Sequence, residues 1–181
     1  GSVALFHMPE VTPEARTSAE AFGDSGVQEK ISIGNEELER ACMQLSTVEE
    51  SQADLVVLGC PHYSVEQIGE TASLLEGRKV RGNVQVWLFT SRAARMLAEE
   101  KRYVRTIEAA GGKVLSDTCA LHMPLRGWNF QTIATDSAKM AHYAPAIIGV
   151  DAVFANTTEC LNYATRRTGR ATGQPWKKSQ Y

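Results

Sequence analysis

The sequence of 181 residues has no apolar run close to the roughly 20 residues that cross a bilayer, and no signal-peptide pattern at its start. It has no excess of basic residues either, because 19 Lys and Arg stand against 21 Asp and Glu. A net charge of −2 lacks the basic footprint typical of nucleic-acid-binding domains. We therefore expect no membrane partner and no nucleic-acid partner, and we predict a cytoplasmic protein.

Internal repeats, low-complexity segments and glycine-rich phosphate-binding motifs are also absent. Hydrophobic residues at 43% and charged residues at 22% are ordinary for a globular domain, and a chain of this length buries roughly 70% of its extended surface. We expect one domain over residues 1–168 and a polar tail at 169–181. Because the chain opens on Gly1-Ser2 rather than Met, we interpret it as an excised piece of a longer protein.

Cysteine is sparse, and none of the four cysteines has a partner at CxxC spacing, which argues against a zinc ribbon or a thioredoxin site. Without a secretion signal, structural disulfides are not expected. The periodicity places Cys42 on the buried face of a helix over 36–45, and Cys160 in the first turn of a helix from Asn156 to 167. We predict that both are packing cysteines in the core.

The most informative stretch surrounds Cys60. Residues 53–58 form an apolar run with the length of a buried parallel strand. Ser64 and Gln67 then have the spacing of a capping box, which predicts a helix over 64–76. Cys60 therefore lies where a strand ends and a helix is about to begin, at the edge where open α/β sheets bind ligands. The alternative is a buried loop cysteine that only packs.

The alternation of strands and helices continues along the chain. A strand at 84–89 is followed by one long helix from Ser91 to 110, which Gly111 ends, and by a strand at 113–116. This order predicts a parallel sheet with right-handed crossovers and a three-layer α/β/α fold. The strands expected in that sheet lie near 28–33, 53–59, 84–89, 113–116 and 152–155, with a further strand candidate at 3–8.

A second cysteine follows a strand in the same way. Asp117-Thr118-Cys119 comes directly after the strand at 113–116, so Cys60 and Cys119 are predicted to share the carboxyl edge of the sheet. Two thiols at such an edge suit an iron–sulfur cluster, whose irons take cysteine thiolates. They equally suit a redox dithiol, and a coincidence of two packing cysteines is the third reading.

A third feature of the sequence is a capped helix start near Asp136 and Ser137. Free backbone N–H groups there, together with Lys139, predict an anion-binding position. The alternative is a simple capped turn with a solvated lysine. His122 lies in the non-periodic loop at 120–130 that precedes this helix.

Four motifs together resemble one known family. In chain order they are Val11-Thr12-Pro13-Glu14-Ala15, Leu58-Gly59-Cys60-Pro61-His62-Tyr63-Ser64, Ser116-Asp117-Thr118-Cys119 and Thr135-Asp136-Ser137-Ala138-Lys139-Met140-Ala141-His142-Tyr143. They closely resemble the large subunit, or catalytic domain, of aconitase X, over nearly the whole chain to about residue 164. The resemblance implies an aconitase-domain-like fold in which Cys60 and Cys119 bind an iron–sulfur cluster, of the 2Fe–2S or the 4Fe–4S type.

The sequence also departs from the wider aconitase superfamily. Ordinary aconitases carry a further cysteine three residues after the second cluster cysteine, where this chain has His122. The family also takes a cluster cysteine from an earlier part of the chain, so the N-terminal part of the enzyme is expected to be missing here. The third ligand is therefore not identified by the resemblance.

The resemblance implies a hydro-lyase that dehydrates a small hydroxy acid. We expect cis-3-hydroxy-L-proline as the substrate, with phosphomevalonate as the alternative. Three residues are implied as substrate contacts: Ser64, Ser137 and Lys139. His62 and His122 are implied as catalytic residues that orient ligands or help the hydroxyl group leave.

The general base of this superfamily is a serine on a separate swivelling domain or small subunit, and we find no such domain in this sequence. We therefore expect the isolated chain to fold but to show little or no dehydratase activity. Two other hypotheses remain open from the residues alone. They are a dithiol redox protein that uses Cys60 and Cys119, and a non-catalytic α/β domain that binds a partner.

Overall fold

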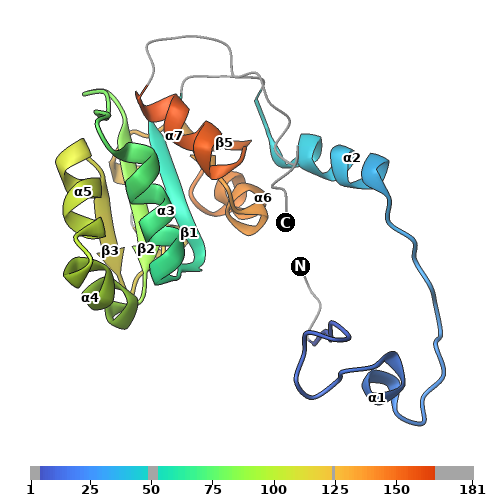
Figure 1. Cartoon of the computed structure of the whole chain (residues 1–181). Coiled ribbons are helices and arrows are strands. Elements are labelled where there is room, and N and C mark those ends of the chain that lie inside the picture. The colour runs from blue at the N-terminus through green and yellow to red at the C-terminus, as the bar shows by residue number, and fades with distance from the viewer. Residues whose placement is uncertain (1–4, 49–52, 124, 166–181) are drawn as a thin grey trace. The chain divides into compact units, whose positions relative to one another are not determined.

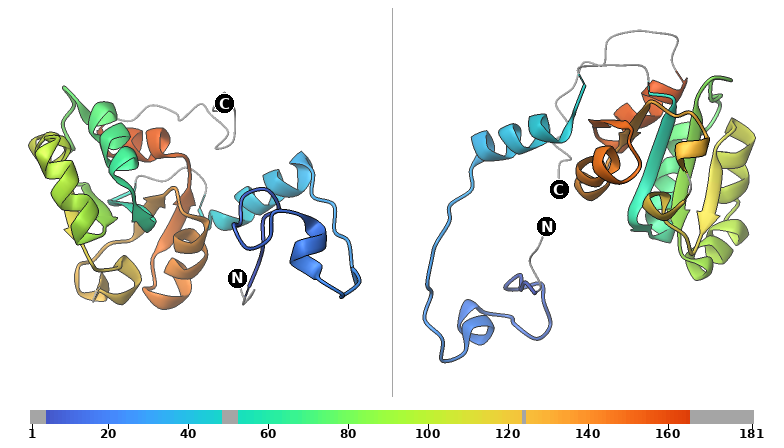
Figure 2. Two further views of the ribbon diagram at one scale, coloured as in Figure 1. Left: turned by 60° about the horizontal axis from the view of Figure 1, so that its bottom comes forward. Right: turned by 180° about the vertical axis from the view of Figure 1, so that it is seen from behind.

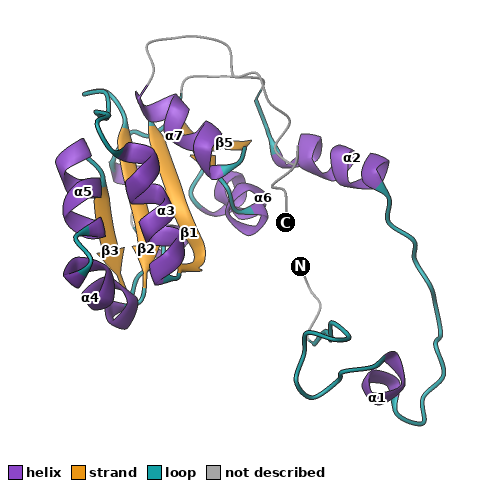
Figure 3. Ribbon diagram, in the orientation of Figure 1, coloured by secondary structure: helices purple, strands orange, loops and turns teal. Residues whose placement is uncertain are grey.

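The computed structural model describes residues 5–48, 53–123 and 125–165, with the side chain of residue 126 left out (Figure 3). The chain divides into two compact units, residues 1–38 and 39–181. The polar tail expected at 169–181 lies outside the described residues, and the domain expected over 1–168 stays a prediction. No helix in the described parts of the chain is long and apolar enough to span a membrane.

In the described part of the first unit, the short helix α1 (Ser18–Phe22) begins at a capping box between Thr17 and Glu20. Residues 5–8 and 28–33 form no strand, so both expectations are wrong for the described residues. Ile31 and Ile33 are 74% and 68% exposed. Their alternation has the period of a strand, but no strand in the described part of the chain supplies the ladder of hydrogen bonds that a strand needs.

Helix α2 (Asn35–Leu45) forms as expected, but none of its residues is buried. Cys42 is only half-buried, and its partial burial raises the pKa of its thiol. The prediction of a core cysteine at this position is therefore wrong. After the helix, the N–H of Thr47 donates to the carbonyl oxygen of Ala152 in β5 (Asp151–Phe154) at 2.9 Å. The segment around Thr47 therefore covers the β5 edge of the sheet.

The second unit contains a sheet of five parallel strands, which confirms the predicted fold class. The strands besides β5 are β1 (Leu55–Tyr63), β2 (Gln85–Thr90), β3 (Lys113–Ser116) and β4 (Thr132–Thr135). Their order is β3-β2-β1-β4-β5, and every neighbouring pair is parallel. The strand order reverses between β1 and β4, which is where doubly wound sheets place a crevice beyond their carboxyl ends.

Strand β4 is the strand that the sequence analysis missed. Its four residues are all buried, so Thr132-Ile133-Ala134-Thr135 shows neither alternation nor a long apolar run. The carboxylate of Asp54 secures its start, because it accepts hydrogen bonds from the N–H groups of Gln131 at 2.7 Å and Thr132 at 3.3 Å. Tertiary contacts rather than a local pattern therefore define this strand.

Helices cover both faces of the sheet, as Figures 1 and 2 show. One face carries α3 (Val65–Leu75), α4 (Arg92–Glu100), α5 (Tyr103–Ala110) and α7 (Thr157–Thr165). The other carries α6 (Ala138–Ile147) and the short 3-10 helices η1 (Ala120–His122) and η2 (Leu125–Gly127). Val56 and Leu58 pack in the first layer, and Leu55 and Val57 in the second. Residues 166–167, expected to end α7, lie outside the described residues.

The long helix expected from Ser91 to 110 is two helices, α4 and α5. Arg102 between them has a left-handed backbone with φ of 65°. The break turns α5 against α3, where the ring of Tyr103 lies over Gly69 and Val104 and Ile107 are buried. A continuous helix would have satisfied the same 3.6-residue periodicity, so the pattern alone did not reveal the break.

Candidate active site at the carboxyl edge of the sheet

Cys60 lies in a bulge of β1 rather than after the strand. Leu58 pairs with Leu88 of β2, and the next residue in register is Tyr63, which pairs with Thr90. Residues 59–62 therefore stand opposite a single residue of β2. We call this segment the Cys60 bulge. It lifts Cys60 out of the ladder and leaves the residue half-buried, against the core layer that contains α6.

Gly59 makes the bulge possible. Its φ of 89° is in the region that favours glycine, and a Cβ atom built there would lie 2.1 Å from the carbonyl oxygen of Phe89. Pro61 follows Cys60 through a cis peptide bond. The close approach to β2 thus requires glycine at the residue immediately before the cysteine.

The bulge closes at Tyr63, which is 6% exposed. The hydroxyl of Thr90 donates to the carbonyl oxygen of Tyr63 at 2.7 Å. The hydroxyl of Tyr63 donates to Asp136, and the hydroxyl of Thr157 donates to the same carboxylate oxygen at 2.8 Å. Burial, reinforced by the Asp136 carboxylate, raises the pKa of Tyr63 far above its ordinary value. The tyrosine therefore remains a protonated donor in the folded chain.

Cys119 lies in a second loop, residues 117–122, which we call the Cys119 loop. Asp117 has a positive φ of 55°, and its carboxylate accepts a hydrogen bond from the N–H of Arg92 at 2.8 Å. The same carboxylate forms an exposed ion pair with the Arg92 guanidinium at 3.0 Å. Cys119 itself is half-buried and precedes η1, which ends at the exposed His122.

The register of the strands brings the two loops to one edge. Tyr63 and Ser116 both pair with Thr90, from opposite sides of β2, so the Cys60 bulge and the Cys119 loop emerge at the same level. Nε2 of His62 donates to the carbonyl oxygen of Thr118 at 2.8 Å, since a carbonyl can only accept. The structure thus places Cys60 and Cys119 at the predicted edge, and His62 joins their loops.

The other predicted site residues lie at two helix starts on this edge. Ser64 is exposed and caps α3, with its hydroxyl accepting from the N–H of Gln67 at 3.3 Å. Ser137 is buried and caps α6, with its hydroxyl accepting from the N–H of Met140 at 3.1 Å. Lys139 is exposed in the first turn of α6. Their roles as substrate contacts stay predictions, and for Ser137 the cap already uses the hydroxyl.

Cys160 has a different environment from the other cysteines. It is fully buried in α7, and its thiol donates to the carbonyl oxygen of Ala155 at 3.5 Å. Burial, helped by the charge of Asp136, raises the pKa of this thiol well above its ordinary value. The prediction of a packing cysteine is confirmed.

The donor set of this edge fits part of a cluster site. Cys60 and Cys119 are free thiols on one edge, which is the chemistry that iron–sulfur clusters require. Within the parts of the chain that the structure describes, no three His, Cys, Asp or Glu residues gather as a metal site. The described residues therefore offer two cysteine thiols and no third ligand.

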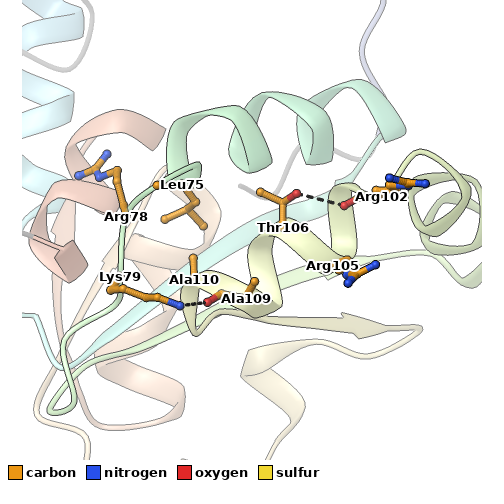
Figure 4. A pocket seen from close by; sticks show the side chains of 9 residues that line it. Leu75, Arg78, Lys79, Arg102, Arg105, Thr106, Ala109 and Ala110 are labelled. Carbon is orange, nitrogen blue, oxygen red and sulfur yellow. Dashed lines mark hydrogen bonds between the residues drawn. The ribbon is translucent and has the colours of Figure 1, made fainter.

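A separate hollow lies between α3 and α5, and none of its lining residues belongs to the Cys60 bulge or the Cys119 loop. It has a volume of about 490 Å³, and its cationic lining residues are Arg78, Lys79, Arg102 and Arg105 (Figure 4). Arg78 donates to the carbonyl oxygen of Leu74 at 3.2 Å, and Lys79 donates to that of Ala109. Two of the four cations thus stabilise the carboxyl ends of helices, where unpaired carbonyl groups favour positive charge.

Comparison with known proteins identifies what the α/β unit is similar to. Residues 53–166 match the family model of the aconitase X third domain. A solved structure, the holo-form of aconitase X from Thermococcus kodakaraensis, superposes with a TM-score of 0.67 at 27% sequence identity. That likeness covers 76% of this chain and 36% of the solved one.

Two curated relatives have different activities in their names. The chain is 36% identical over 165 residues to the cis-3-hydroxy-L-proline dehydratase of Pseudomonas aeruginosa, which covers 90% of this chain and 28% of that protein. It is 37% identical over 161 residues to the phosphomevalonate dehydratase large subunit of Methanocaldococcus jannaschii, covering 89% of this chain and 38% of that protein. The chain thus spans well under half the length of these relatives.

Proposed function

Since the chain belongs to the aconitase X family, we propose that it forms part of an iron–sulfur-dependent hydro-lyase that dehydrates a small hydroxy acid. The observation that carries this proposal is the placement of Cys60 and Cys119 on one carboxyl edge, where His62 joins their loops. A redox dithiol would need the same pair of thiols, but the family and its named dehydratases favour cluster chemistry.

Cys60 and Cys119 would bind the cluster, and the remaining ligands would come from outside the described residues. When bound, an iron ion of the cluster supplies a Lewis acid for the leaving hydroxyl group. The residues of this chain hold the site in place: the Cys60 bulge fixes one thiol and the Cys119 loop fixes the other. The cluster would be of the 2Fe–2S or the 4Fe–4S type.

The substrate would lie over the starts of α3 and α6. In the first turn of α6 the Ser137 hydroxyl already caps the N–H of Met140, so the N–H groups of Ala138 and Lys139 and the Lys139 side chain would receive a carboxylate. His62 donates through Nε2 to Thr118, which leaves Nδ1 to face a ligand, and His122 would act from the end of η1. These two histidines are the proposed catalytic residues, and Ser64 would be a further substrate contact.

We propose cis-3-hydroxy-L-proline as the substrate, in line with the relative from Pseudomonas aeruginosa. Phosphomevalonate is the second candidate, because the relative from Methanocaldococcus jannaschii is equally similar. That relative is named a large subunit, which supports a partner: a small subunit or a fused swivelling domain that carries the serine base. A cytoplasmic location remains our prediction.

The test uses a complete enzyme that contains this chain, purified and reconstituted with iron and sulfide without oxygen. We expect bound iron and turnover of cis-3-hydroxy-L-proline, and loss of both in Cys60→Ser and Cys119→Ser. Cys42→Ser is the matched control, because Cys42 lies on α2 and belongs to neither the Cys60 bulge nor the Cys119 loop, and it should leave both unchanged. Turnover of phosphomevalonate alone would select the second candidate, and an iron-free enzyme with a reversible Cys60–Cys119 disulfide would overturn the proposal.

A further inference from the structure

Three separate segments meet at the carboxylate of Asp136. Tyr63 arrives from the end of β1, Asp136 follows β4, and Thr157 begins α7. Both hydroxyls donate to one oxygen of the carboxylate, and the two hydroxyl oxygens lie 3.4 Å apart. The three residues therefore form one hydrogen-bonded group at the point where the strand order of the sheet reverses.

The group closes the C-terminal end of the Cys60 bulge. Tyr63 is the residue at which β1 regains its register with β2, and its carbonyl oxygen is also bound by the buried hydroxyl of Thr90. The bulge is thus fixed at both ends, by the glycine geometry of Gly59 at its start and by the side chain of Tyr63 at its end. A change at Tyr63 releases one end and leaves the other.

We propose that the Tyr63–Asp136–Thr157 group is a positioning device. It holds Cys60 where its thiol can bind the cluster and fixes the position of Cys60 relative to the start of α6. The role of Cys60 as a cluster ligand rests on the proposed function, whereas the coupling between the Tyr63–Asp136–Thr157 group and the Cys60 bulge does not. Asp136 directly precedes Ser137, the cap of α6, so the same carboxylate fixes both the thiol and the predicted anion-binding helix start. Tyr63, Asp136 and Thr157 touch no reacting atom in this assignment.

The first test measures amide hydrogen exchange in the chain itself, in Tyr63→Phe and in a matched control, Tyr103→Phe. Tyr103 is a half-buried tyrosine whose hydroxyl has no hydrogen bond among the described residues. In Tyr63→Phe we expect exchange over residues 59–64 to rise about tenfold while β3 stays as in the parent chain, because the opening is local. The control should change neither segment.

An equal rise over all strands would show a merely structural tyrosine and overturn the proposal, and so would no rise at all. Should Tyr63→Phe fail to fold, Thr157→Val keeps the shape but removes one of the two donors, and the same segment should exchange about threefold faster. Unchanged exchange over residues 59–64 in a folded Thr157→Val chain would then overturn the proposal.

The second test follows iron in the complete enzyme. Transfer of iron to a chelator should be about tenfold faster in Tyr63→Phe than in the parent enzyme, and Tyr103→Phe should match the parent. A parent enzyme that holds no iron would refute the proposed function, and the exchange measurement would still decide the positioning role. Equal transfer rates with a stably bound cluster would refute the positioning role alone.

Discussion

The Cys60 bulge and the Cys119 loop present the same residue type at the same edge, but the protein holds them differently. The bulge lies in the central strand, between two neighbours, and buried groups close it: Tyr63 and Thr90 are at most 6% exposed. The Cys119 loop follows β3, the edge strand, and an ion pair with Arg92 that is largely exposed to solvent holds it.

The two loops are therefore stabilised by interactions of different strength. Buried hydrogen bonds are expensive to break because the unpaired group stays away from water, whereas exposed bonds exchange readily for bonds to water. Changes in the bulge should therefore affect stability more than equivalent changes in the loop. His62 belongs to the Cys60 bulge but donates a hydrogen bond to the Cys119 loop, so a substitution at His62 measures how much this connection contributes to stability.

The largest effect is expected from Gly59→Ala. The new Cβ would lie 2.1 Å from the Phe89 carbonyl oxygen at a φ of 89°, so overlap and backbone strain together should lower the free energy of unfolding by about 4 kcal/mol. Gly82→Ala is the matched control, because its Cβ would meet no atom within 4 Å. Denaturant unfolding measures both, and equal stability of the two variants would contradict the rigid bulge.

The second prediction concerns pH. The folded chain raises the pKa of Tyr63, so between the unfolded pKa of about 10 and the folded pKa the unfolded state has lost a proton that the folded state retains. The contribution of Tyr63 to the free energy of unfolding is therefore complete below about pH 10 and decreases above it, by about 1.4 kcal/mol at pH 11. In urea unfolding at pH 8 and 11, the free energy of unfolding of Tyr63→Phe should lack this decrease. An identical pH dependence in the parent chain and the variant would refute the prediction.

In the Cys119 loop, Asp117→Ala should lower the free energy of unfolding by about 1 kcal/mol. The variant removes a helix-capping acceptor for the Arg92 N–H and an exposed ion pair. Asp117→Asn retains an acceptor and tolerates the positive φ, so it should stay within about 0.5 kcal/mol of the parent. A loss as large as that of Gly59→Ala would remove the contrast between the two loops.

The smallest effect is expected from His62→Ala. It removes one exposed hydrogen bond between the loops, so the free energy of unfolding should fall by about 0.5 kcal/mol. His142→Ala, at an exposed site on α6, is the control and should lie closer to zero. A loss above about 2 kcal/mol in His62→Ala would indicate that the connection is part of the core.

Several elements of the α/β unit could be predicted from local sequence signals. The capping box of Ser64 and Gln67 and the glycine end at Gly111 begin and end helices as predicted, because each satisfies backbone groups within a few residues. The shared edge of Cys60 and Cys119 followed from the handedness of parallel crossovers, which depends on backbone chirality rather than on particular contacts.

The features that depend on residues distant in the chain could not be predicted from local patterns. Residues 28–33 have no neighbouring strand among the described residues and do not form one, whereas the four residues of β4 form a strand because β1 and β5 lie on either side. The bulge required Gly59 to meet Phe89, and its closure required Tyr63 to reach Asp136, 73 positions away. A periodicity reports which side of an element is apolar, but only the packed chain determines which atoms complete each hydrogen bond.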